Sequence, residues 1–261
     1  MNQNNNWKVR LDIPLGGGFS EKFSFIPSDT KDRFKDNLNK FPDSPHLLNY
    51  QKNPINYSIN NYGFRTPDDF FDGDEGTVYL GCSHTFGTGH HLENTWAYKL
   101  HNQIGDGKFI NLSCGSIGLT SQYVYLKYFS EKLKIKKIFH YYPNECFFRY
   151  EFFNTNEELD FFNANSNNKE LNSFYYKYLM SEAQNDLHNL SYLDAIKNVC
   201  RENNANYYIY NKSFIDLEST SDAYHKKLTP ARDLIHLYVE HHDEICTHFL
   251  EQERTNKLEI I

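Results

Sequence analysis

The sequence offers little cysteine chemistry. Its 261 residues include five cysteines, an odd number at wide spacing and without a CxxC pair: Cys82, Cys114, Cys146, Cys200 and Cys246. This pattern argues against a disulfide framework and against a structural zinc site. It is typical of a reducing compartment.

Long apolar runs are also missing. No stretch approaches the roughly 18 apolar residues that indicate a membrane span. The first residues (MNQNNNWKVRLDIPLGGG) lack the apolar segment of a signal peptide. We therefore expect a chain without a membrane span, located in the cytoplasm.

Positive charge is not in excess. The chain has 27 Lys and Arg against 34 Asp and Glu, a formal net charge of -7, whereas nucleic-acid binders usually present a basic face. The clearest basic cluster (Lys132, Lys134, Lys136 and Lys137) lies where a helix is expected to end, and cations are favourable there. Nucleic acid is not expected as a partner.

Recognised metal and phosphate motifs are absent. His90-His91 and His241-His242 have no carboxylate or cysteine at a known ligand spacing, and HExxH does not occur. We expect these histidines on solvated loop and helix surfaces. Residues 16–18 (GGG) are not followed by the Lys-Ser/Thr of a phosphate loop. The sequence predicts no metal and no organic cofactor.

What the sequence does contain is an alternation of apolar strands and amphipathic helices. Strands are predicted at 77–81, 108–112, 137–142 and 206–210, and helices at 93–104, 120–133, 192–201 and 237–253. This alternation predicts an α/β fold with a parallel sheet and helices on both faces. Residues 1–75 are predicted to be a loop-rich N-terminal extension packed on the core, with a short strand or two. Residues 76–261 form the main domain, with an insertion at about 151–190.

Two motifs indicate nucleophilic catalysis. Residues 81–87 (GCSHTFG) follow the strand at 77–81 and place Ser83 in a strand-to-helix turn. A serine hydroxyl needs a general base to act as a nucleophile. Residues 231–236 (ARDLIH) supply Asp233 and His236 three positions apart, so the carboxylate can hold the imidazole tautomer. In isolation, a helix cap is the better interpretation of Ser83, and an ordinary surface Asp and His is the better interpretation of the DxxH motif.

Two further loops follow predicted strands and can supply an oxyanion hole. Residues 111–118 (NLSCGSIG) contain Gly115, whose backbone N–H can approach a reacting carbonyl. Residues 143–145 (PNE) contain Asn144, whose side-chain amide can donate a second hydrogen bond.

The order of these four segments resembles the SGNH (GDSL-like) hydrolase superfamily, whose blocks carry Ser, Gly, Asn and His. Residues 81–87 resemble the first block, in the subgroup that has Cys where most members have Asp, and residues 231–236 resemble the last. Residues 57–67 (YSINNYGFRTP) resemble a stretch upstream of the first block in some members, including carbohydrate-acting esterases. The resemblance covers roughly residues 57–145 and 228–250.

The resemblance implies a three-layer α/β/α sandwich with about five parallel strands in a flavodoxin-like arrangement. It makes Ser83 the nucleophile and first oxyanion donor, His236 the general base and Asp233 its orienting partner. Gly115 and Asn144 become the remaining oxyanion donors. Counting from Asn111 puts Ser116 rather than Gly115 at the usual glycine position, so both stay open.

The function predicted in this way is a serine esterase that forms an acyl-enzyme on a small-molecule ester, such as a carbohydrate O-acetyl ester or a lipid. The alternatives are an acyltransferase on the same fold and a non-catalytic binding module. Cys82 is an alternative nucleophile to Ser83. It is less favoured because a cysteine at the end of a buried strand usually packs in the core without reacting. The oligomeric state does not follow from the sequence.

Overall fold

Four of the predicted strands form one parallel sheet in a computed structural model of the chain. The structure describes residues 21–143, 150–153, 159–162, 169–174, 177–178, 181–212 and 228–255. The sheet strands are β3 (Glu75–Leu80), β4 (Lys108–Asn111), β5 (Lys134–Tyr141) and β8 (Asn206–Tyr210), in the order β4-β3-β5-β8. The predicted α/β class is confirmed. About five strands were expected, and the described residues contribute four.

The strands are buried on both faces because their apolar side chains point alternately to opposite sides. On β3, Val78 and Leu80 pack into one apolar cluster, and Tyr79 between them packs into the other. On β5, Ile138 and Phe139 divide between the same two clusters. This double burial explains why each strand appears in the sequence as a short continuous apolar run.

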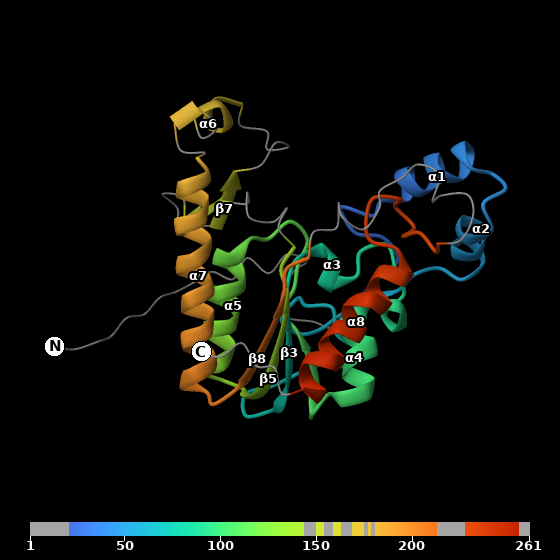
Figure 1. The fold of residues 1–261 in the computed structure, drawn as a ribbon. Coiled ribbons are helices and arrows are strands. Elements are labelled where there is room, and N and C mark those ends of the chain that lie inside the picture. The colour runs from blue at the N-terminus through green and yellow to red at the C-terminus, as the bar shows by residue number, and fades with distance from the viewer. Residues whose placement is uncertain are drawn as a thin grey trace.

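Helices cover both faces of this sheet (Figure 1). On one side α5 (Leu119–Ser130) packs against α7 (Glu182–Glu202), and on the other α4 (Trp96–Ile104) packs against α8 (Val239–Arg254). A 3-10 turn, η1 (Leu92–Asn94), precedes α4, and the short helix α3 (Ser83–Phe86) follows β3. Because α3 begins where a strand ends, it lies at the carboxyl edge of the sheet, where ligands bind in such folds.

The N-terminal extension contains two helices that the sequence prediction missed. The expected short strands are β1 (Glu21–Phe23) and β2 (Tyr57–Ile59), which pair antiparallel. Between them lie α1 (Lys31–Lys40) and α2 (Pro45–Lys52). Thr30 and Ser44 cap them through hydrogen bonds from Arg33 N (3.2 Å) and Leu47 N (3.4 Å). No residue of α1 is fully buried, and its apolar face is limited to the partly buried Phe34 and Leu38.

The predicted insertion begins with an antiparallel hairpin of β6 (Tyr150–Phe153) and β7 (Leu159–Phe162), followed by α6 (Lys169–Phe174). Helix α7 then begins at Glu182, earlier than the predicted start near 192. In Figure 1, β7 and α6 lie beside the upper end of α7, beyond the level at which the sheet strands end.

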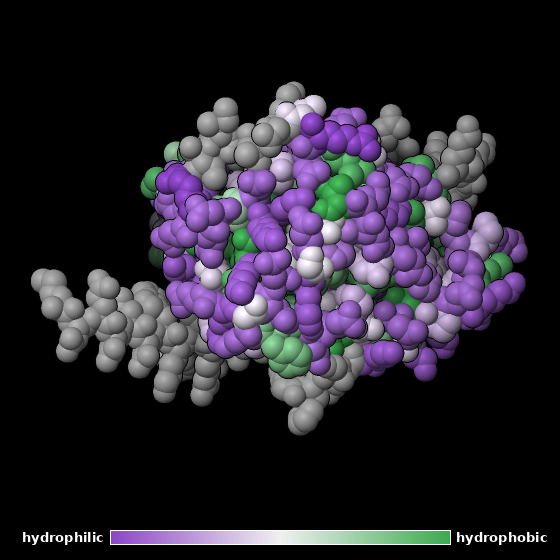
Figure 2. Space-filling model, turned by 90° about the horizontal axis from the view of Figure 1, so that it is seen from below, coloured by the Kyte–Doolittle hydropathy of each residue, from purple (hydrophilic) through white to green (hydrophobic). Residues whose placement is uncertain are grey.

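The opposite end of the molecule, where the strands begin, is hydrophilic over most of its area, with small separate apolar spots (Figure 2). Three lysines of the basic cluster pair with carboxylates: Lys132 with Asp72 (3.3 Å), Lys136 with Glu75 (2.7 Å) and Lys137 with Glu253 (2.6 Å).

Within the described ranges, no helix combines the length and apolar character needed to cross a membrane.

Candidate active site

Ser83 is the first residue of α3, directly after the turn that ends β3. It is buried, with 6% of its surface exposed. The turn requires glycine at position 81, because a Cβ there would lie 2.0 Å from Thr85 Oγ1 and 2.7 Å from the Tyr141 carbonyl oxygen. The predicted strand-to-helix placement of Ser83 is therefore confirmed.

Arg65 stabilises the backbone that follows Ser83. Its guanidinium donates to the carbonyl oxygens of Phe86 (3.1 Å), Gly87 (2.6 Å) and His90 (2.8 Å). The side chain is fully buried and lies 4.4 Å from the centre of the Tyr57 ring. Burial lowers the pKa of Arg65 to about 10, so the group keeps its charge at neutral pH. Arg65 thus fixes the loop that follows Ser83.

Asp233 and His236 form the predicted pair. Asp233 Oδ2 lies 2.6 Å from His236 Nδ1, and its Oδ1 accepts hydrogen bonds from the backbone N–H groups of Ile235 (3.1 Å) and His236 (3.3 Å). The carboxylate is fully buried, whereas the imidazole is 12% exposed. The two residues belong to a turn ahead of α8 in which Leu234 adopts a left-handed φ of 57°.

The environment of Asp233 favours its charged form. Burial raises the pKa of this carboxyl, but the hydrogen bond from His236 and the two backbone donors outweigh it, and the net pKa is lowered. An ionised Asp233 holds the proton of His236 on Nδ1. In this tautomer of the neutral imidazole, Nε2 is the nitrogen that can accept a proton.

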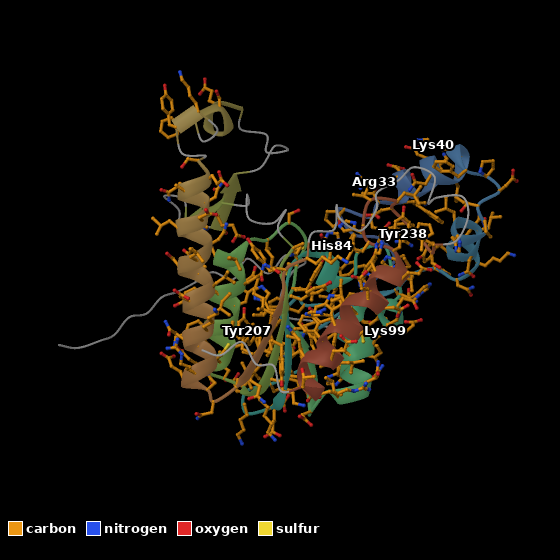
Figure 3. All side chains as sticks on the ribbon, viewed as in Figure 1. Arg33, Lys40, His84, Lys99, Tyr207 and Tyr238 are labelled. Atoms are coloured by element: carbon orange, nitrogen blue, oxygen red, sulfur yellow. The ribbon has the colours of Figure 1, made fainter. Side chains whose placement is uncertain are left out.

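The two motifs lie side by side, although they are far apart in the sequence. Arg232 N donates to Gly89 O (2.8 Å), and a Cβ on Gly89 would lie 2.8 Å from Ala231 Cβ. The rings of His84 and His236 meet edge to face, with their centres 5.3 Å apart; Figure 3 shows His84 at the carboxyl edge of the sheet. Among the described residues, no hydrogen bond joins Ser83 Oγ to His236.

A buried ion pair ties both motifs to the N-terminal extension. Arg232 Nε lies 3.1 and 3.0 Å from the two Asp29 oxygens, and its terminal nitrogen lies 2.6 Å from Asp29 Oδ2. Tyr57 donates its hydroxyl proton to Asp29 Oδ2 (2.5 Å) and accepts from Gly89 N (2.9 Å). The sequence prediction gave no role to Asp29 or Arg232; the only signal was the place of Arg232 beside Asp233.

The loop after β4 carries the contested oxyanion residues. Gly115 and Ser116 are exposed in a turn, and Ser116 adopts φ 64°, a conformation that favours glycine. A Cβ on Gly115 would meet no atom within 4 Å. The glycine-like backbone is thus at Ser116, the position reached by counting from Asn111. Which backbone N–H serves as donor stays a prediction.

Asn111 connects this loop to the serine turn, a role that the sequence prediction did not assign. Its buried side chain donates to Thr85 O (3.4 Å) and accepts from Ser113 N (3.2 Å). The remaining predicted donor, Asn144, lies outside the described residues, as does Cys146.

The expectation of solvated histidines is wrong for His90 and His242. Both are fully buried, and their ring centres lie 5.0 Å apart. His90 Nε2 is 2.5 Å from Leu237 O, and Trp96 N donates to His242 Nδ1 (3.2 Å). Burial lowers the pKa of His90 to about 4. His242 shares a buried stripe of α8 with Ile245, Cys246 and Phe249, a spacing visible in the sequence.

Four cysteines of the described chain are buried and outside any disulfide: Cys82, Cys114, Cys200 and Cys246. Cys82 caps α3 with its backbone and is 0% exposed, which agrees with a packing role. Among the residues that the structure describes, no cluster of three or more His, Cys, Asp or Glu side chains is placed to hold a metal ion.

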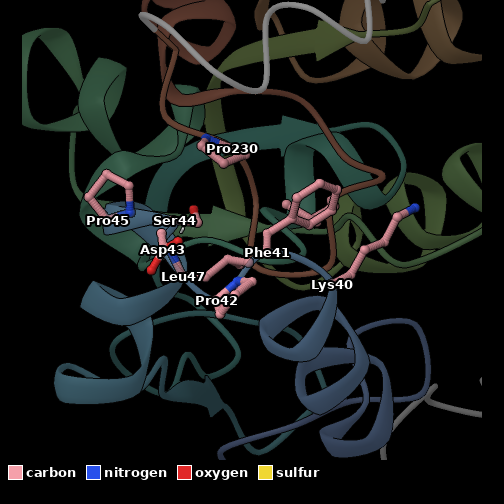
Figure 4. A pocket seen from close by; sticks show the side chains of 9 residues that line it. Lys40, Phe41, Pro42, Asp43, Ser44, Pro45, Leu47 and Pro230 are labelled. Atoms are coloured by element: carbon pink, nitrogen blue, oxygen red, sulfur yellow. Dashed lines mark hydrogen bonds between the residues drawn. The ribbon is translucent and has the colours of Figure 1, made fainter.

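A cavity of about 380 Å³ lies between the loop that contains Asp233 and His236 and the turn that joins α1 to α2 (Figure 4). Its lining includes Phe41, Pro42 and Leu47 from the extension, and Pro230 and Leu234 from the loop. Neither Ser83 nor His236 lines it.

The family assignment remains a prediction from these motifs. Comparison of the chain with protein-family models, with curated proteins and with solved structures found no match.

Proposed function

We propose that this chain is a serine hydrolase of the SGNH (GDSL-like) class, which cleaves a carboxylic ester through an acyl-enzyme. The observation that carries the proposal is the Asp233–His236 pair (2.6 Å), packed against the turn that contains Ser83. A buried carboxylate that fixes the tautomer of a partly exposed imidazole beside a serine is the arrangement used in acyl transfer.

The strand order supports the same proposal. Counted along the chain, the sheet strands run second, first, third, fourth. These are the first four positions of a flavodoxin-like sheet, whose ligands bind beyond the carboxyl ends of the strands. Ser83 and the Gly115–Ser116 turn both follow such ends, directly after β3 and β4.

The proposed reaction begins when Ser83 Oγ attacks the ester carbonyl and His236 Nε2 takes the hydroxyl proton. The oxyanion rests on the backbone N–H of Ser83, on that of Gly115 or Ser116, and on Asn144. His236 then gives its proton to the leaving alcohol, and water releases the acid by the reverse steps. Hydrogen bonds between nucleophile and base often tighten only when substrate is bound, so the absence of a Ser83–His236 bond is compatible with this sequence.

The test is turnover of p-nitrophenyl acetate by wild type, Ser83→Ala and His236→Ala. Ser130→Ala, at the far end of α5, is the matched control. We expect the control to equal wild type and both site variants to lose turnover by at least about 10³-fold. Equal rates for wild type and Ser83→Ala would exclude Ser83 as the nucleophile, and a loss confined to Cys82→Ala would transfer that role to Cys82.

Covalent labelling separates the proposed enzyme from a binding module. A fluorophosphonate should add to wild type on the peptide that contains Ser83, and not to Ser83→Ala. No labelling of the folded protein favours a non-catalytic module. Formation of an acylated sugar, when a sugar acceptor is added with the ester, indicates an acyltransferase instead.

A further inference from the structure

Helix α5 begins without a side-chain cap from its own segment. Its N-cap residue is Gly118, which has no side chain to accept hydrogen bonds from the first-turn N–H groups. Residues 119–121, whose N–H groups precede the first hydrogen bond within the helix, are all buried, so water has little access to these donors. Buried helix ends of this kind need another acceptor.

Glu151, on β6, supplies that acceptor. Its Oε1 accepts from Gly118 N (2.9 Å) and Ser121 Oγ (2.5 Å), and its Oε2 accepts from Ser121 N (2.8 Å). Glu151 as a whole residue is only 4% exposed. The positive end of the helix dipole favours a carboxylate there, and bonds between N–H groups and a charged acceptor are stronger than neutral ones.

The contact between Glu151 and Gly118 lies next to the loop that contains Gly115 and Ser116. Gly118 lies two residues after Ser116, so Glu151 fixes one end of the loop whose backbone is expected to hold the oxyanion. The other end is fixed by β4 and by the bonds of Asn111. Glu151 pairs with Phe161 of β7 within the insertion hairpin. The hairpin and the oxyanion loop are therefore joined through one buried carboxylate.

We propose that Glu151 is a positioning residue, which couples the insertion hairpin to the catalytic centre by holding the Gly115–Ser116 loop. This inference rests on the proposed function, because it assigns the loop a role in catalysis. An oxyanion donor is effective only when it is held close to the position of the developing charge. Glu151 acts on the reaction through the loop, not by contact with substrate.

The test compares Glu151→Gln with Glu131→Gln, a matched change at the exposed C-terminal end of the same helix. Glutamine keeps the size of the side chain but turns one acceptor into a donor that faces N–H groups. We expect Glu151→Gln to lower kcat by between about 10- and 100-fold with little change in KM, and Glu131→Gln to leave both unchanged. An unchanged kcat per folded Glu151→Gln molecule, or a change in KM alone, would overturn the proposal.

A second measurement separates this proposal from a purely structural role. Ser121→Ala removes one hydrogen bond of the same carboxylate. The fold-loss of kcat in the double variant with Glu151→Gln should therefore be smaller than the product of the two single losses. Independent, multiplying effects would contradict a shared action through one loop.

Hydrogen exchange tests the role of Glu151 independently of the proposed serine-hydrolase function. Amides in residues 115–121 should exchange at least about tenfold faster in Glu151→Gln than in Glu131→Gln; equal protection would refute the contact itself. A wild type without Ser83-dependent turnover would refute the proposed function, while faster exchange in the same preparation would still support the coupling of hairpin and loop.

Discussion

The buried Asp29–Arg232 pair gives the sharpest prediction for stability. The change Asp29→Asn keeps the shape of the side chain but removes its charge. Arg232, 1% exposed at its side chain, is then left without a charged partner. Tyr57 loses a charged acceptor for its hydroxyl at the same time. Both losses occur where water does not replace the missing partner.

The magnitude follows from this burial. Removing one partner of a buried ion pair costs about 3–5 kcal/mol of unfolding free energy. For a chain of this size, each kcal/mol lowers Tm by about 2–4 °C, so Tm should fall by roughly 6–20 °C. Urea unfolding followed by circular dichroism gives the free energy directly. Asp36→Asn, on the exposed side of α1, is the control and should stay within about 0.5 kcal/mol of wild type.

The double variant Asp29→Leu/Arg232→Met tests the cause. Replacing both charges with apolar groups removes the uncompensated guanidinium, so it should recover most of the loss. The reasoning would be refuted by a free energy for Asp29→Asn within 1 kcal/mol of wild type. A double variant less stable than Asp29→Asn would refute it as well.

Three further predictions follow from the site. Gly81→Ala should destabilise the fold by about 2–4 kcal/mol, because its Cβ would overlap the Tyr141 carbonyl, whereas Gly115→Ala should be neutral in urea unfolding; equal effects would contradict the assigned turn. Arg65→Lys cannot reach three carbonyls, so fluorophosphonate labelling should slow and stability should fall by about 3 kcal/mol; unchanged labelling would argue against its support of the turn. Because the folded pKa of Asp233 is lowered, its contribution is present above the unfolded pKa of about 3.9 and is lost as pH falls through the lower folded value. The difference in unfolding free energy between wild type and Asp233→Asn should therefore shrink as the pH falls below the unfolded pKa, and a constant difference would be inconsistent with the lowered pKa.

The sheet could be predicted from the sequence because each strand is buried on both faces. Double burial forces a continuous apolar run, as in Val78–Leu80, and such runs survive in a sequence without any knowledge of the fold. The helices α1 and α2 could not be found in this way. They lie on the surface, and their stability depends on local caps and on packing by a few residues, such as Leu47 and Tyr50 of α2.

Local contacts of the site were predictable and distant ones were not. The Asp233–His236 bond spans three residues, so its spacing is visible in the chain. The partner of Arg232 comes from a segment with no chemical signature of its own, and Glu151 lies in a region without a recognisable motif. His90 was misjudged because its burial depends on α8, which contacts it only after the chain has folded.

The separation of Asp29 from Arg232 sets an order for the maturation of this protein. They stand 203 residues apart, and a ribosome adds about 5–20 residues per second. Asp29 therefore waits roughly 10–40 s before its partner is even made. During that time the growing chain holds the serine turn without the arginine segment that docks beside it. Ser83 and the Asp233–His236 pair can meet only after the later segment is made, so a truncated or stalled product would carry Ser83 without that pair.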